Sequence, residues 1–249
     1  MISAIVLTRN EENNIIDCLE SITWCDEIIV VDDSSVDRTL QVIKNFNPRV
    51  KIFQHNLKGD FSAQRNFGLS KARGEWILFI DADERLSNGL RGEIMDYVSS
   101  KNKNYGGFYV ERKDVIWGKE LKHGETGNIS LLRFARKNAG VWHGKVHEAW
   151  DIKGETGNFR MLLYHYPHQS IREFLMEINF YTDVRAKELY DRGEKVNFLK
   201  IILHPLLKFK INYFLKLGFL DGVEGLIFAL MMSFHSFLVR AKLWTLSSR

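Results

Sequence analysis

The feature that most constrains this fold is the alternation of short apolar runs with helical segments over the first hundred residues. Runs rich in β-branched and aromatic residues, bounded by polar turns, are Ile2–Leu7, Glu27–Val31, Val50–Gln54 and Trp76–Ile80. Such runs are typical of strands buried on both faces. Apolar residues at helical spacing fill the intervening segments Glu11–Ile22, Asp37–Phe46 and Phe61–Ala72. This order predicts βαβ units and an α/β fold, with a mostly parallel sheet flanked by helices.

The pattern changes after residue 105. Strand-like segments separated by loops rich in Gly, His and Trp are Gly107–Glu111, Ile129–Ala135 and Phe159–His165. Helical segments follow over Ser170–Asp191, Asn197–Leu217 and Leu220–Leu243. We therefore expect one domain over residues 1–194, with halves 1–105 and 106–194, and a helical tail over 195–249.

Composition excludes several other classes of protein. The chain has 249 residues, of which 45% are hydrophobic and 27% charged, with only three prolines, so it is neither disordered nor fibrous. A chain of this length buries a large core without a metal or disulfide staple. Cys18 and Cys25 have no redox or metal-ligand spacing, which fits a reducing compartment. Met1 leads directly into the first apolar run without a basic region or a cleavage site, so we expect no signal peptide.

Positive charge is concentrated in the tail. The whole chain carries 35 − 31 = +4, whereas residues 195–249 hold eight Lys and Arg against Asp221 and Glu224, or +6. The longest uncharged run there, Gly225–Val239, has 15 residues, short of the roughly 20 that span a bilayer. A basic, aromatic and apolar tail of this kind predicts an amphipathic element on a membrane surface. A pair of core helices or a homo-oligomer interface is the alternative.

Polar clusters follow three of the predicted strands. They are Thr8-Arg9-Asn10-Glu11, Asp32-Asp33-Ser34-Ser35 and Asp81-Ala82-Asp83-Glu84. Open parallel sheets bind ligands at the carboxyl ends of their strands, so these clusters should converge on one edge. Two carboxylates one residue apart, as in Asp81 and Asp83, repel each other unless a cation joins them, and such hard ligands suit Mg²⁺ or Mn²⁺. A solvated loop is the plainer interpretation of the triplet, and helix capping that of the Asp32 cluster.

Four motifs, in this order, resemble the family 2 glycosyltransferases. They are Val-Leu-Thr-Arg-Asn-Glu-Glu, Val-Val-Asp-Asp-Ser-Ser-x-Asp-x-Thr, Gln-Arg-Asn-Phe-Gly and Phe-Ile-Asp-Ala-Asp-Glu. The resemblance covers about residues 1–100, and Trp142–Glu148 is similar to a W-x-G-x-x-H-E element of bacterial members. The subgroup most similar to this chain acts on the lipopolysaccharide core as a β-1,4-glucosyltransferase. The resemblance implies a GT-A fold and an inverting, metal-dependent transfer from a UDP-sugar, UDP-glucose in the subgroup, to a cell-envelope glycan or glycolipid.

The resemblance also implies roles for individual residues. Donor-binding roles fall to Thr8, Arg9, Asn10, Glu11, Asp32, Asp33, Arg65, Asn66, Asp81 and Ala82. Asp83 would bind the metal. His147 and Glu148 would supply a second metal or diphosphate contact and the catalytic base. In this scheme residues 1–105 form the nucleotide-sugar-binding half and residues 106–194 the acceptor-side half.

The sequence departs from processive relatives downstream. Their acceptor-side Glu-Asp pair and Gln-x-x-Arg-Trp element are missing, which argues against a polysaccharide synthase and leaves Glu111 and Asp114 as alternative bases to Glu148. A non-catalytic nucleotide-sugar-binding protein, a haloacid-dehalogenase-like phosphohydrolase and a nucleotidyltransferase are the competing classes. The expected partners are a nucleotide sugar, the acceptor and the inner face of the cytoplasmic membrane, without nucleic acid.

Overall fold

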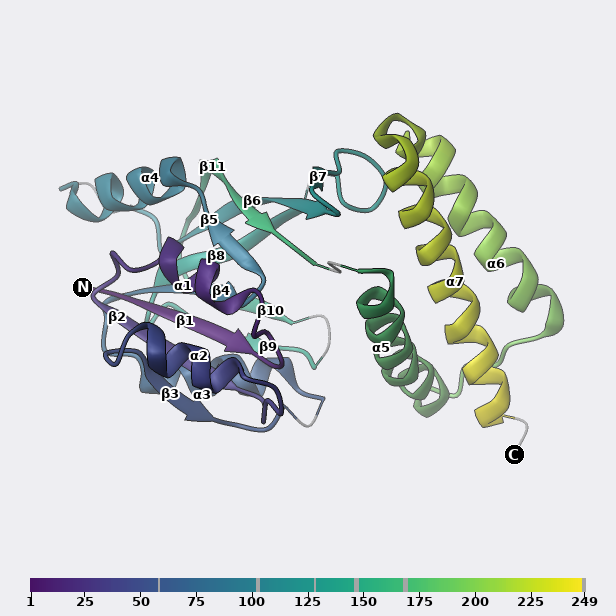
Figure 1. Cartoon of the computed structure of the whole chain (residues 1–249), viewed down its shortest axis with the longest axis horizontal. Helices are drawn as coiled ribbons and strands as arrows, with labels where there is room; N and C mark the ends of the chain where they lie inside the picture. The colour runs from purple at the N-terminus through teal and green to yellow at the C-terminus, as the bar shows by residue number, and fades with distance from the viewer. Residues whose placement is uncertain (58, 102–103, 128, 146–147, 168–169, 248–249) are drawn as a thin grey trace. The chain divides into compact units, whose positions relative to one another are not determined.

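The computed structural model describes residues 1–57, 59–101, 104–127, 129–145, 148–167 and 170–247. Two compact units make up the chain (Figure 1). The first comprises Met1–Arg112 and Ile129–His165, and the second comprises Lys113–Asn128 and Tyr166–Arg249. The helix over residues 171–191, which the sequence analysis placed in the first domain, therefore belongs to the second unit.

The first unit contains the parallel half of a sheet, in the order β3-β2-β1-β4. Its strands are β1 (Ile2–Thr8), β2 (Glu27–Asp32), β3 (Lys51–Gln54) and β4 (Trp76–Asp81). All seven residues of β1 and all six of β2 are buried, which explains why both strands read as continuous apolar runs. Thr8 pairs with Asp32 and Leu7 with Asp81, so the predicted convergence of strand ends is confirmed.

Antiparallel strands extend this sheet beyond β4, in the order β4-β8-β6-β11-β5. They are β5 (Glu84–Leu86), β6 (Gly107–Ile116), β8 (Ile129–Arg136) and β11 (Thr156–His165). A separate hairpin consists of β9 (Gly140–His143) and β10 (Ala149–Ile152). The α/β class is confirmed, but the sheet is mixed rather than mostly parallel, because the second half of the unit adds strands by antiparallel pairing.

Helices and the hairpin cover the two faces of the sheet. On one face α1 (Ile15–Ser21), α2 (Thr39–Phe46) and α4 (Asn88–Ser99) enclose the larger core cluster. On the other face lie α3 (Phe61–Lys71) and the two hairpin tryptophans. A Cβ on Gly68 of α3 would lie 2.6 Å from Cγ2 of Ile5. Glycine therefore lets α3 lie directly against β1, which holds the helix next to the sheet edge.

The second unit is helical. Its elements are the short β7 (Lys119–Glu120), α5 (Ile171–Asp191), α6 (Phe198–Lys210), a π-helical turn (Ile211–Leu215), a 3₁₀ turn (Gly218–Asp221) and α7 (Gly222–Ser247). Helix α7 packs against both α5 and α6. Ile116, the last residue of β6, and Leu121, just after β7, share a core with Phe174, Ile178 and Phe228. The stretch Lys113–Asn128 is also anchored by Asp221, which accepts a hydrogen bond from the backbone N–H of His123 at 2.9 Å.

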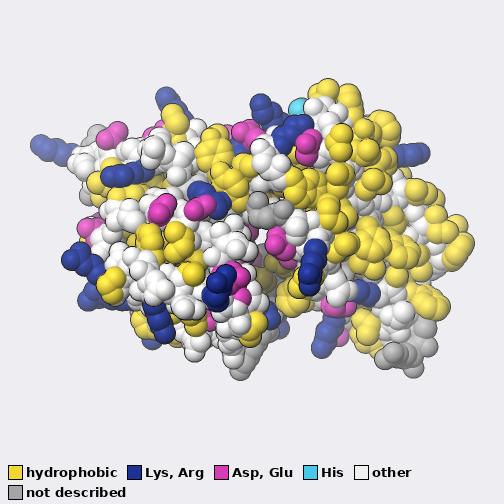
Figure 2. Space-filling model, in the orientation of Figure 1, with side chains coloured by type: hydrophobic (Ala, Val, Ile, Leu, Met, Phe, Trp, Pro, Cys, Tyr) yellow, Lys and Arg dark blue, Asp and Glu magenta, His cyan; other side chains and the backbone are white. Residues whose placement is uncertain are grey.

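Helix α6 exposes most of its apolar residues. No residue of α6 is buried, and Phe198, Leu199, Leu203 and Leu206 are at least half exposed. In Figure 2 hydrophobic side chains gather over this helical unit. By length and composition alone, one described helical stretch, Gly218–Ser247, could cross a membrane. That is weak evidence for crossing, because core helices pass the same test, and α7 packs on two neighbours.

Candidate active site

The carboxyl ends of β1 and β2 form a compact polar corner. The backbone N–H of Asp33 donates to the carbonyl of Thr8 at 2.9 Å, and Arg9 Nη1 lies 3.1 Å from Asp33 Oδ2. Asn10 has a positive φ of 55°, and its Oδ1 accepts from the N–H of Val36 at 2.8 Å. The N–H of Glu11 donates to Thr39 Oγ1. Thr8 at the end of β1 and the three residues after it are thus held against the segment after β2.

The two neighbouring aspartates of this corner have different surroundings. Asp32 is fully buried, and both its carboxylate oxygens accept hydrogen bonds from Ser35, so its side chain holds the turn. Asp33 accepts from the N–H of Leu57 at 2.7 Å and faces Arg9. Thr8 Oγ1, also buried, has no hydrogen-bond partner among the described residues. Asp33 and Thr8 are therefore the better candidates to contact a ligand.

Asp81 lies between two buried arginines. Its carboxylate accepts from Arg65 Nη2 at 3.0 Å and from Arg133 Nη2 at 2.6 Å. Burial raises the pKa of Asp81, but the charges of Arg133 and Arg65 outweigh burial and lower it below its ordinary value. Asp81 is consequently an ionised anchor for both guanidinium groups, with little capacity left to coordinate a metal.

Asp83, the second carboxylate of the triplet, faces a histidine. Its Oδ2 lies 3.1 Å from Nε2 of His165, at the end of β11. Ala82, between the two acids, is buried, and its N–H donates to the carbonyl of Leu7. The described part of the chain contains no cluster of three or more groups able to hold a metal ion. His147, predicted as a metal contact, lies outside the described residues.

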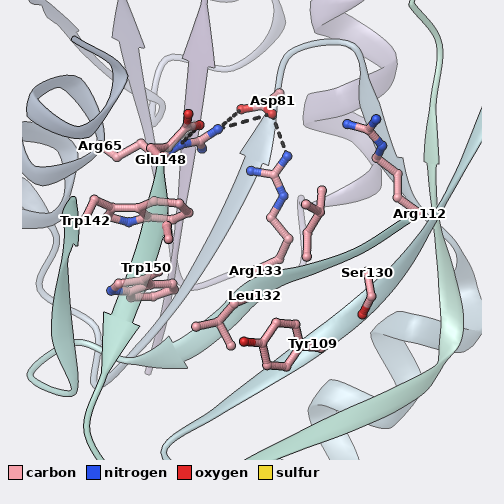
Figure 3. A pocket seen from close by; sticks show the side chains of 12 residues that line it. Arg65, Asp81, Tyr109, Arg112, Ser130, Leu132, Arg133, Trp142, Glu148 and Trp150 are labelled. Carbon is pink, nitrogen blue, oxygen red and sulfur yellow. Dashed lines mark hydrogen bonds and ion pairs between the residues drawn. The ribbon is translucent and has the colours of Figure 1, made fainter. Parts of the chain in front are cut away.

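Glu148 lies beside Asp81, on the opposite side of Arg65. Its Oε1 is 3.1 Å from Arg65 Nε, so one guanidinium joins the two carboxylates (Figure 3). A cavity of about 560 Å³ opens in front of them. Other lining residues are Tyr109, Arg112, Arg133, Trp142 and Trp150. The structure thus brings Glu148 to the end of β4, although 67 positions separate it from Asp81 in the sequence.

Two stacked indoles form one wall of this cavity. The rings of Trp142 and Trp150 lie 5.4 Å apart and nearly parallel, at 14°, and the Arg65 guanidinium lies 4.7 Å from the Trp142 ring. Asn66 fixes this wall, because its side chain donates to the carbonyl and accepts from the N–H of Trp142, both at 2.9 Å. Asn66 was predicted to lie beside the nucleotide, and in the structure its side chain joins α3 to β9.

The alternative bases lie elsewhere. Glu111, on β6, does not line the cavity. Asp114 is buried and belongs to the second unit. Glu148 alone of the three candidates shares a cavity with Asp81.

Sequence reasoning missed Arg133 and gave His165 no role in the metal site. Arg133 bridges Asp81 and the fully buried Glu84, at 2.6 and 2.7 Å. Burial raises the pKa of Glu84, since the buried carboxylate loses its hydration. The sequence does mark Arg133 as unusual, because it interrupts the otherwise apolar run Leu131–Ala135. Its contacts become clear only from the pairing of β8 with β4.

Fold and site define an α/β enzyme whose polar groups gather at the carboxyl edge of its parallel strands. Residues 3–162 match the family described as Glycosyl transferase family 2. The chain belongs to this family and is a glycosyltransferase, which confirms the resemblance found in the sequence.

Several bacterial proteins are similar over nearly the whole chain. The lipopolysaccharide core biosynthesis glycosyltransferase LpsC of Rhizobium meliloti is 28% identical, over 98% of this chain and 92% of its own. The uncharacterized glycosyltransferase RT0209 of Rickettsia typhi is 29% identical, over 99% of this chain and 87% of its own. Among solved structures, S. aureus TarS 1–349 in complex with UDP covers 100% of this chain and 91% of its own, at 16% identity and a TM-score of 0.49. That likeness is too loose to relate individual residues.

Proposed function

We propose that this chain transfers a sugar, with inversion, from a UDP-sugar to a hydroxyl group of a cell-envelope glycan or glycolipid. UDP-glucose is the first donor to test. The observation that carries the proposal is the register of β1, β2 and β4, which brings Asp33, Asp81 and Asp83 to one edge. Glu148 and the tryptophan wall lie next to Asp81.

The corner after β1 and β2 is proposed to hold the nucleoside. Among the described residues Asp33 Oδ2 has Arg9 as its hydrogen-bond donor, and such an oxygen can also accept the imide N–H of uracil or a ribose hydroxyl. The unpartnered hydroxyl of Thr8 supports this assignment, because a buried polar atom without a hydrogen bond is costly unless a ligand satisfies it.

A divalent cation is proposed at Asp83. Mg²⁺ is commonly held by one or two protein groups, with substrate phosphates and water filling the other positions. Asp83 offers the carboxylate oxygens that Mg²⁺ and Mn²⁺ prefer, and His165 lies 3.1 Å from one of them. A bound cation would stabilise the charge of the departing diphosphate. Arg65 and Arg133, anchored on Asp81, place further positive charge at the same end of β4.

Glu148 is proposed as the base that removes the proton from the acceptor hydroxyl. Its side chain is half-buried at the cavity, and its second oxygen, Oε2, makes no hydrogen bond to a described residue. Stacked indoles offer an apolar surface of the kind that packs against a sugar ring. With the diphosphate at Asp83, attack by the acceptor from the opposite face of the sugar inverts the anomeric carbon.

A membrane-borne acceptor is proposed for two reasons. The LpsC protein, similar along both chains, is named for lipopolysaccharide core biosynthesis. The second unit also exposes apolar side chains on α6 beside a net positive charge. Together these features favour an enzyme at the inner membrane face acting on a lipid-linked glycan.

A donor panel tests the proposal. The chain is incubated with UDP-glucose, other UDP-sugars, GDP-mannose and a CMP-sugar, with and without Mn²⁺, and release of the nucleotide is measured. Asp33→Asn should lower the affinity for UDP, whereas Asp96→Asn, an exposed acid on α4, should not. Faster release from GDP- or CMP-sugars than from every UDP-sugar would overturn the donor assignment.

A further inference from the structure

A second cavity, of about 450 Å³, lies within the helical unit between α5, α6 and α7. Its lining is mixed. Arg185, Lys208 and Arg240 are the cations, and Glu194 is the acid. His204 and His235 are also part of the wall, surrounded by aliphatic side chains. A cavity of this composition suits an anion attached to an apolar body.

Arg240 is the cation of this cavity that makes no ion pair with a described residue, although Glu194 acts on its charge at longer range. Its Nη1 donates to the backbone carbonyl of Ser236 at 3.0 Å, and its Nη2 donates to Nδ1 of His204 at 2.8 Å. Among the described residues no carboxylate lies within ion-pairing distance of it. By contrast, Arg185 pairs with Glu188 and Lys208 with Glu125. A half-buried guanidinium without a direct ion pair is costly, and a bound anion would offset that cost.

The two histidines add hydrogen-bond donors to the same cavity. Since arginine can only donate, His204 accepts at Nδ1 and carries its proton on Nε2. The ring nitrogens of His235 make no hydrogen bond within the described part of the chain. Arg240 Nε has no acceptor there either. Several N–H groups that line one cavity beside a guanidinium match the oxygens of a phosphate.

The surroundings identify the source of such a phosphate. Leu207 on α6 lines the cavity and is more than half exposed, next to the exposed Leu203 and Leu206. Lys200, Lys210 and Lys216 are exposed on the same unit. Because apolar and basic groups together favour an anionic lipid surface over a soluble phosphate, the ligand should be part of a membrane.

We propose that this cavity binds the phosphate group of an anionic lipid headgroup, with Arg240, His204 and His235 as donors. The inference rests on the proposed function only in taking the acceptor to be at a membrane. A basic surface alone would attract any anionic lipid, whereas this cavity would recognise the phosphate group itself.

The test compares two vesicle types of equal surface charge. One contains phosphatidylcholine with phosphatidic acid, and the other phosphatidylcholine with cholesteryl hemisuccinate, whose charge is a carboxylate. The full chain should bind the first about tenfold more tightly, the factor expected for charge-assisted hydrogen bonds to one phosphate. Arg240→Gln should abolish this preference. Lys210→Gln, which removes the same charge from an exposed site, should weaken both bindings equally and keep the ratio.

Further measurements separate the possible failures. His235→Gln should also reduce the preference for the phosphate vesicles, and it should disturb the fold less than Arg240→Gln does. Circular dichroism checks that each variant is folded. Equal binding of both vesicle types by the unaltered chain overturns the inference. If soluble glycerol phosphate binds as tightly as the vesicles, and Arg240→Gln removes that binding, the lipid assignment is wrong. Affinity for UDP reports on the first unit, so normal UDP binding without a phosphate preference leaves the proposed function in place.

Discussion

At the scale of single residues, Arg133 is the group that allows Glu84 to be buried next to the charged Asp81. It contacts Asp81 and Glu84, while Arg112 lies 3.7 Å from Glu84 on another side. Removing one partner of a buried ion pair leaves uncompensated charge, whereas an exposed pair contributes little. The sequence places a second arginine, Arg136, on the same strand, paired with the exposed Glu75.

These two arginines provide a matched comparison. Arg133→Gln should lower the free energy of unfolding by about 3–5 kcal/mol. Arg136→Gln should change it by no more than about 1 kcal/mol. Urea unfolding at neutral pH measures both. Similar values for the two variants would mean that the buried network does not stabilise the sheet edge.

The role of Asp83 is tested through metal dependence. Asp83→Asn should abolish the increase in UDP affinity that Mn²⁺ produces, because the amide is a much weaker ligand than the carboxylate. Calorimetry with and without the metal measures this, and Asp96→Asn is the control. An unchanged metal effect in Asp83→Asn would remove this residue from the proposed site.

Glu148 is tested by separating binding from transfer. Glu148→Gln should keep its affinity for the UDP-sugar and lose about 10²–10⁴ in transfer rate, the usual contribution of a general base. Glu111→Gln should transfer normally. If instead Glu111→Gln is inactive and Glu148→Gln is active, Glu148 serves only to hold Arg65.

At the scale of elements, Glu27 at the start of β2 joins three segments of the chain. Its carboxylate accepts from Ser3 on β1, from Lys51 on β3 and from Arg73 after α3. Burial raises its pKa, but these hydrogen bonds outweigh burial and lower the pKa to about 2. A carboxyl group whose pKa is lower in the folded chain than in the unfolded chain stabilises the fold. This contribution is complete at a pH above the unfolded pKa, and it is lost as the pH falls toward and through the folded pKa.

The stability contribution of Glu27 should therefore depend on pH. At pH 7, Glu27→Gln should reduce the free energy of unfolding by about 2–3 kcal/mol, and the difference from the unaltered chain should shrink by about half at pH 3. Urea unfolding at the two pH values checks this. A difference that stays constant would show that the carboxylate charge is not the cause.

Elements with strong periodicity were predictable from sequence. The strands β1, β2 and β4 and the helices α3 and α5 lie within a few residues of their expected bounds. Helix α4 was missed because Gly89 and Gly92 interrupt its apolar pattern. The hairpin β9–β10 was missed because strands of four residues show too little alternation.

The candidate site divides in the same way. Residues that follow a strand, such as Asp33 and Asp83, were found because the sheet rule gives their position. Arg133 lies within a strand that pairs with a distant one, and no local pattern reveals that pairing. Contacts that depend on long-range antiparallel pairing could therefore not be predicted from this sequence.

At the scale of the whole molecule, apolar exposure on α6 predicts how the chain meets lipid. Leu203→Gln should weaken binding to anionic vesicles about tenfold, because a leucine side chain loses about 1.5–3 kcal/mol of burial. Met95→Gln, at an exposed position of α4 in the first unit, should bind normally. Sedimentation with vesicles at low and high salt measures both, and equal binding by the two variants would contradict a membrane contact through α6.

The chain passes between its two units three times, after residues 112, 128 and 165. Domain exchange between relatives must respect this path. A chimaera that replaced only residues 166–249 would set a foreign helical bundle against the original Ile116 and Leu121, which pack on Phe174, Ile178 and Phe228. Replacing residues 113–128 together with 166–249 keeps the interlocking pieces matched. The helical unit is therefore encoded by two separate stretches of the gene, and a chimaera that exchanges only one of them should fail to fold correctly.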